Sequence, residues 1–247
     1  MNVRTTAATV VRILAQLRHD PRTVVLLLAV PALLLTLLRY MFDAPGASAT
    51  FDRVALVVLG LFPFTVMFLV TSIAMLRERR SGTLERLLTT PMGRLDLLLG
   101  YGTAFGLVAV VQAAVVTTAA FGVFGVQAAG SVWWAGLIAV LTALLGTALG
   151  LLCSAFARTE FQAVQFLPVV VLPQTLLCGL FVARDAMAGW LQGLSSALPL
   201  TYAVEALQQV GARTDVTATL VLDTGVVAGS VLLALALAAA TLRRRTP

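Results

Sequence analysis

The chain has 247 residues, of which 60% are hydrophobic and only 11% charged, and its formal net charge is +6. Soluble domains carry about 25% charged residues, so this composition excludes an ordinary soluble enzyme and indicates an integral membrane protein. Positive charge suggests nucleic acid in a soluble chain, but retention of Arg beside a membrane explains it here, so we expect no nucleic-acid partner.

The expected elements, in chain order, are all helical. Residues 1–23 predict an amphipathic helix at the membrane interface, because Val10, Ile13, Leu14 and Leu17 share one helical face. A basic flank that only orients the first span is an equally open interpretation. Six apolar runs follow, each long enough to cross a membrane, within one domain over 24–247: 24–42, 54–76, 97–125, 133–156, 161–182 and 218–242.

The distribution of Arg predicts the orientation. Only four of the 17 basic residues fall on the side opposite the N-terminus: Arg39, Arg53, Arg184 and Arg213. Basic residues gather on the cytoplasmic side of membrane proteins, so both termini and residues 77–94 should be cytoplasmic.

Residues 187–210, within the stretch 183–211, are apolar enough to suggest a seventh span, which would place the three C-terminal Arg outside. This stretch also holds Gly193, Pro199 and Glu205. Irregular backbone at membrane depth survives only where protein or a water-filled cavity covers it. We therefore expect an external re-entrant hairpin of two short helices.

Residue types needed for catalysis are scarce. The chain has one His and no Lys, so it contains neither a metal cluster nor the lysine of a phosphate-binding loop. Cys153 and Cys178 fall at different predicted depths, too far apart for a disulfide, and should be packing residues. The span centres carry almost no ionisable residue, so any transport must be powered from elsewhere.

The 77–94 segment, RERRSGTLERLLTTPMGR, is the most informative stretch. Leu84, Leu87 and Leu88 share one face of a short helix, which Pro91 ends. An apolar ridge with a charged rim suits a helix that docks in a groove of another protein, or one that lies on the lipid surface. The residues alone do not separate these two interpretations.

A resemblance does separate them. The run from Glu78 to Met92, followed by Gly100, resembles the signature of type-two ABC exporter permeases, and most of all the bacterial group typified by the daunorubicin permease. The likeness extends to the interfacial helix, the six spans, and the Leu-Pro-Leu-Thr-Tyr run at 198–202 before Glu205. It implies a bacterial plasma-membrane protein.

The resemblance further implies that 77–94 is a coupling helix seated on a separate ABC-type ATPase. Two ATPase copies and a second permease chain, in a homodimer, would complete the transporter. This chain would bind no cofactor, because ATP and Mg would sit on the ATPase. The coupling residues would be Glu78, Gly82, Thr83, Leu84, Glu85, Leu87, Leu88 and Pro91, and the outer gate would hold Leu198, Pro199, Tyr202 and Glu205.

In this family the cargo path lies between the two permeases, along spans two and five. The candidates there are aromatic or uncharged polar: Phe62, Phe64, Met67, Phe68, Gln165, Phe166 and Gln174. Such residues suit a hydrophobic or amphipathic cargo, such as a drug, an antibiotic or a lipid-like compound. For any single one of these residues, ordinary packing or lipid contact is the favoured interpretation. A glycan or glycolipid exporter, or a membrane scaffold without transport, are the alternatives.

Overall fold

The computed structural model describes residues 3–44, 46–80 and 94–241. Among these residues the chain is helical and contains no strand. The order of long helices is α1 (Val3–Arg18), α2 (Pro21–Met41), α3 (Ser48–Arg80), α5 (Arg94–Thr118), α6 (Val132–Ser154) and α11 (Ala218–Thr241). Shorter elements are η1 (Ala119–Val123), α7 (Glu160–Phe166), η2 (Leu167–Val171), α8 (Leu172–Leu177), η3 (Arg184–Ala186), α9 (Gly189–Ser196) and α10 (Pro199–Ala212).

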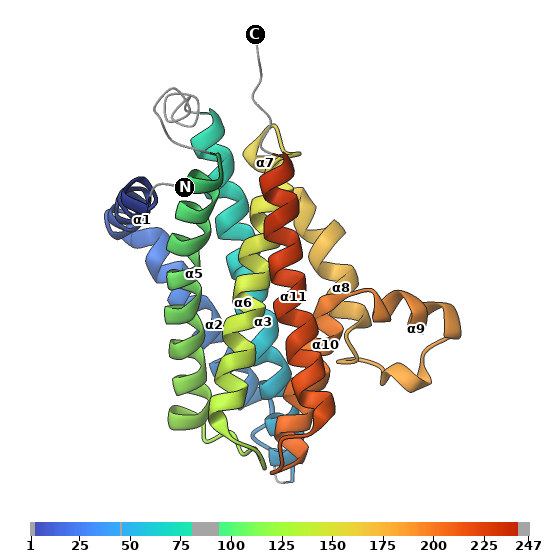
Figure 1. Cartoon of the computed structure of the whole chain (residues 1–247). Helices are drawn as coiled ribbons and strands as arrows, with labels where there is room; N and C mark the ends of the chain where they lie inside the picture. The colour runs from blue at the N-terminus through green and yellow to red at the C-terminus, as the bar shows by residue number, and fades with distance from the viewer. Residues whose placement is uncertain (1–2, 45, 81–93, 242–247) are drawn as a thin grey trace.

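The long helices run roughly side by side, and α1 lies across them (Figure 1). Five helices of the described chain are long and apolar enough to cross a membrane: α2, α3, α5 with η1, α6 and α11. Large apolar side chains on their outer faces are exposed, among them Leu232, at 69%. Such surface suits lipid contact, and the chain is a multi-pass membrane protein.

The centre of the bundle is the contact between α3 and α6, the most extensive between two helices of the described chain. Two glycines of α6 allow the close approach. A Cβ at Gly146 would lie 2.1 Å from the carbonyl oxygen of Phe64, and one at Gly150 would lie 2.6 Å from that of Phe68. Small residues let membrane helices approach closely, so this pair serves packing inside one subunit.

The amphipathic helix predicted near the N-terminus is present as α1, and its apolar stripe packs on the bundle. Ile13 is 4% exposed, and Val10 and Leu14 join the same cluster. A Cβ at Gly100 would lie 2.7 Å from Cγ2 of Thr9, so α1 crosses α5 at this glycine. The Gly100 of the sequence signature is therefore the place where α1 is seated.

The fifth span differs from the prediction. A helix over 161–182 was expected, but the helical residues end at Leu177, and η2, a π-helical segment, interrupts them. Pro168 and Pro173 each remove a backbone donor and crowd the preceding turn, and such prolines break or kink a helix. Gly179, with φ of +90°, then turns the chain away.

The 183–211 region contains two helices, α9 and α10, after the short turn η3. Helix α9 projects sideways from the bundle, whereas α10 lies beside the lower half of α11 (Figure 1). Helix α10 also packs on α3 and α6, with Leu200 and Leu207 fully buried. A re-entrant path through the membrane for these helices stays a prediction.

The two cysteines behave as expected. Cys153 and Cys178 are both buried and free. They fill space in the core cluster, and this confirms their assignment as packing residues.

Candidate coupling site and outer cavity

We name one end of the bundle the basic end, where α3 ends, α5 begins and α11 ends (Figure 1). The predicted coupling segment begins inside α3, whose last turn is residues 77–80, and Arg94 already opens α5. Seven of the eight predicted coupling residues lie outside the described residues: Gly82, Thr83, Leu84, Glu85, Leu87, Leu88 and Pro91. Glu78 is the exception.

Glu78 lies in a cluster that joins three helices. Its Oε1 is 2.6 Å from Nη1 of Arg12 on α1, and the two side chains are 13% and 29% exposed. Nη2 of Arg12 donates a hydrogen bond of 2.7 Å to the hydroxyl of Tyr101 on α5, and the guanidinium lies 6.0 Å from the Tyr101 ring centre. We call Arg12, Glu78 and Tyr101 the basic-end cluster.

Burial disfavours the charged form of Arg12, but its contacts with Tyr101 and Glu78 outweigh this effect. The net pKa of Arg12 is therefore raised above its ordinary value. The guanidinium of Arg12 therefore stays charged.

A second ion pair ties α3 to the start of α7. Nε and Nη2 of Arg77 donate to the two carboxylate oxygens of Glu160, at 2.9 and 3.1 Å. The hydrogen bond from Arg77 lowers the pKa of the Glu160 carboxyl below its usual range. The last turn of α3 is thus fastened to α1, α5 and α7 together.

Sequence reasoning missed Arg12, Tyr101 and the Arg77–Glu160 pair. Their separations along the chain are 89 residues for Arg12 and Tyr101 and 83 for Arg77 and Glu160, so no local pattern relates them. The one available signal was Glu78 itself, an acidic residue among Arg at the end of an apolar helix.

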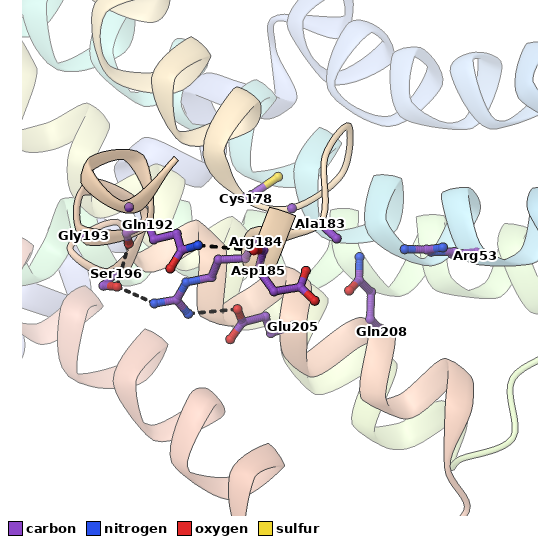
Figure 2. A pocket seen from close by; sticks show the side chains of 12 residues that line it. Arg53, Cys178, Ala183, Arg184, Asp185, Gln192, Gly193, Ser196, Glu205 and Gln208 are labelled. Atoms are coloured by element: carbon purple, nitrogen blue, oxygen red, sulfur yellow. Dashed lines mark hydrogen bonds and ion pairs between the residues drawn. The ribbon is translucent and has the colours of Figure 1, made fainter. Parts of the chain in front are cut away.

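The predicted outer-gate residues come together at the junction of α9 and α10. Leu198 and Pro199 begin α10, and the Tyr202 hydroxyl donates to the carbonyl oxygen of Ser196 at 2.8 Å. Oε1 of Glu205 accepts from Nη1 of Arg184 at 2.9 Å. Figure 2 shows Arg184 reaching between Glu205 and Ser196, whose Oγ also accepts from it.

A cavity of about 700 Å³ opens beside this junction, and we call it the outer cavity. Its lining is polar and charged, with Arg53, Arg184, Asp185, Gln192, Glu205 and Gln208 among its residues. Figure 2 places Arg53 and Gln208 on one side of the cavity, away from the Arg184–Glu205 pair. Arg184, the partner of Glu205, was not predicted as a site residue.

The predicted path residues do not share one surface. Phe64, Met67 and Phe68 are fully buried inside this chain, under α6 and its neighbours. Gln174 is 4% exposed and donates to the carbonyl oxygen of Val170 at 3.1 Å. Phe62 and Phe166 are half-buried and Gln165 is exposed. A cargo path along these residues stays a prediction.

The comparison with known families decides the affiliation. The family model described as ABC-2 type transporter matches residues 5–210. The chain belongs to the ABC-2 type transporter family. Its members are the permease subunits of ABC transporters, and the match covers α1, the basic-end cluster, the outer cavity and most of α10.

Curated relatives agree with this affiliation. The probable multidrug ABC transporter permease YbhR of Escherichia coli is 29% identical over 144 residues, which are 58% of this chain and 39% of that protein. The inner membrane transport permease YhhJ of the same species is 28% identical over 141 residues, 57% of this chain and 38% of that protein. ABC transporter G family member 20 of Dictyostelium discoideum is 26% identical over 150 residues, 61% of this chain and 20% of that protein.

The matched part is therefore about two fifths of the length of the two bacterial relatives.

Proposed function

We propose that this chain is the membrane-spanning permease of an ATP-driven exporter, and that a separate ABC-type ATPase powers it through residues 77–94. Family membership and the names of the bacterial relatives support this proposal. The observation that carries it is the basic-end cluster, because Arg12 joins the two helices, α3 and α5, that flank the predicted coupling segment.

Helix α3 supplies a path from this end to the outer cavity. Its 33 residues span about 50 Å at 1.5 Å per residue. Gly146 and Gly150 hold it against α6, so the two helices move as one body. Near its other end α3 packs on α10, where a Cβ at Gly60 would lie 2.8 Å from Cδ1 of Leu207.

A displacement of the coupling segment by the ATPase would therefore reach α10 and the Arg184–Glu205 pair. ATP binding would close the ATPase dimer, draw the two coupling segments together, and open the paired permeases outward. This is a rigid-body transition of packed helices.

The cargo we propose is a hydrophobic or amphipathic compound, such as a drug, an antibiotic or a lipid-like molecule. The YbhR relative carries the name of a multidrug permease, and the exposed polar and half-buried aromatic residues of span five suit such a compound. Two ATPase copies and a second permease chain, as a homodimer, would complete the assembly. ATP and Mg would bind the ATPase and not this chain.

We place the protein in a bacterial inner membrane with both termini in the cytoplasm. The basic end carries Arg12, Arg77, Arg79 and Arg80, and Arg158 precedes α7 near the same end. The opposite orientation would put this positive charge outside.

Co-purification in detergent tests the proposal. The native chain, tagged and co-expressed with a candidate ABC-type ATPase, should retain it, whereas the double variant Leu87→Asp plus Glu85→Arg should lose it while keeping a monodisperse elution profile. Equal retention by both proteins would refute the assignment of the coupling segment. Failure of the native chain to retain any ABC-type ATPase would count against the exporter and favour a scaffold.

A further inference from the structure

A second concave surface lies between α1, α2 and α3, close to the basic end. It encloses about 500 Å³, and we call it the α2–α3 groove. Leu27, which is 2% exposed, belongs to its floor, and Leu26, 61% exposed, belongs to its open edge. The volume lies within the range of 300–1,000 Å³ typical of small-molecule sites.

The polar residues of the groove gather at one end. Gln16, Asp20 and Arg77 line the end next to α1, with Thr23 beside them. Beyond them the α3 wall is aliphatic from Ile73 back to Val66. A groove with a polar end and an apolar length matches a molecule that has a polar head and a hydrocarbon chain.

The dimensions of the α2–α3 groove match one hydrocarbon chain of a ligand. From Val66 to Arg77 the α3 wall spans about 16 Å at 1.5 Å per residue. The α2 wall, from Thr23 to Val30, covers about 10 Å of the same length. One extended hydrocarbon chain of medium length occupies such a trough.

The lining argues against a helix of a second copy as the occupant. Two close helix contacts of this chain are made at glycine, at Gly146 against α3 and at Gly100 against α1. The groove is lined by branched side chains such as Val66, Val70 and Ile73, and no glycine is among the described residues that line it. Flexible methylenes follow such a surface more closely than a helical backbone can.

The charges at the polar end complement a zwitterionic head. The Asp20 carboxylate caps α2 by accepting from the backbone N–H of Thr23 at 3.3 Å, and its other oxygen accepts from the Thr23 hydroxyl at 2.6 Å. Arg77, 61% exposed, already donates Nε and Nη2 to Glu160, so a phosphate would bind through its Nη1. A quaternary or primary ammonium suits Asp20, and a phosphate suits Arg77.

We propose that the α2–α3 groove binds one single-chain zwitterionic amphipath from the leaflet at the basic end, with its chain along α3 and its head between Asp20 and Arg77. This site does not depend on the proposed exporter function. The ligand is a lipid of the membrane that stays bound, and an incoming cargo molecule is an alternative outcome of the test.

Photolabelling tests the proposal on the full chain in lipid nanodiscs. The probe is lysophosphatidylcholine with a diazirine on its acyl chain, and the adducts are mapped by mass spectrometry. Labelling of the native chain should concentrate between Val66 and Ala74 of α3 and between Leu26 and Val30 of α2. Adducts spread evenly over the lipid-facing helices would overturn the site, whatever the variants do.

A groove-filling variant sharpens the test. Ala74→Phe should lower the adduct yield roughly tenfold, the factor expected when about two methylenes lose their burial. The matched control is Ala236→Phe, because Ala236 is exposed on α11 and no described residue of α11 lines the groove, so this variant should leave the yield unchanged. Equal yields in the two variants would overturn the proposal.

The contact between the polar head of the ligand and Asp20 is tested separately. Asp20→Asn retains a good helix cap but removes the charge, and should lower labelling by lysophosphatidylcholine roughly threefold, as for a partly exposed ion pair. Labelling by an uncharged monoacylglycerol probe should not change. An identical response of the two probes would overturn the assignment of the head.

The source of the ligand follows from one more measurement. With the ATPase partner and a non-hydrolysable ATP analogue present, labelling should stay constant, as expected of a resident lipid. A fall in labelling would identify an incoming cargo and overturn the assignment to a resident lipid. Retention of the ATPase in the same preparation reports on the exporter proposal independently.

Discussion

The ion pair between Arg12 and Glu78 should contribute measurably to stability, because both side chains are less than one third exposed. Each single variant, Arg12→Gln or Glu78→Gln, leaves a partly buried charge without its partner. A hydrogen bond to a charged group contributes about 1.5–3 kcal/mol. We expect each variant to cost about 2–3 kcal/mol, and the double variant to cost about 2 kcal/mol less than the sum.

Thermal unfolding in detergent provides the assay. Cys153 and Cys178 are buried and free, so a thiol-reactive dye reports their exposure on unfolding. A coupling energy of about 2 kcal/mol corresponds to about 4–8 °C in melting temperature for a chain of this size.

The exposed pair Arg39–Asp43 is the matched control. Its atoms are 3.4 Å apart with side chains 41% and 70% exposed, so the same cycle there should give about 0.5 kcal/mol or less. If the Arg12–Glu78 cycle gives no more coupling than this control, the basic-end cluster does not hold α1 to α3, and the proposed transmission through it fails.

Three further predictions follow from the geometry. Gly146→Ala should sharply reduce the folded yield in fluorescence-detected size exclusion, because the new Cβ would lie 2.1 Å from a backbone carbonyl oxygen of α3. The control Gly102→Ala should not reduce the yield, because its Cβ would lie 3.8 Å from a side-chain methyl group. Equal yields of the two variants would contradict the α3–α6 packing. The native chain should be slightly more stable than the Glu160→Gln variant above the ordinary carboxyl pKa near 4.5, and this difference should vanish as pH falls through the lowered pKa of Glu160 in the folded state. Melting curves of the two proteins from pH 7 to 3 that differ by a constant amount would exclude the Arg77 pair as the cause. Arg184→Gln should increase hydrogen exchange in α9 and the start of α10 because its ion pair and hydroxyl contact are lost, and unchanged exchange would show that other contacts hold that junction.

The sequence was sufficient for the parts of the fold that depend on local pattern. Apolar runs predicted the spans, and the stripe through Ile13 predicted α1. The break in the fifth span was not predicted, because Pro168 and Pro173 occur in an apolar run of ordinary length and proline is tolerated in many membrane helices. Within the break the carbonyl oxygens of Val170 and Val171 accept from the side chains of Gln174 and Thr175, contacts that an apolar run does not reveal.

Contacts between residues far apart in the sequence could not be predicted from local sequence patterns for a related reason. Phe64 and Phe68 lie on a helix that is apolar on every face, so periodicity gives no sign that their backbone carbonyl groups meet α6. Arg12 and Glu78 are charged residues far apart in the sequence, and the crossing of α1 over α5 at Gly100 brings them together. The sequence identified Glu78 through a resemblance, and the structure supplies its partner.

Transport by the assembled complex tests the central claim most directly. Inside-out vesicles containing this chain and its ABC-type ATPase are given a fluorescent amphipathic dye and ATP. The account predicts ATP-dependent uptake that requires both proteins and disappears when the ATPase lacks its phosphate-binding lysine. Uptake that persists with the inactive ATPase, or that only an ion gradient drives, would contradict the account.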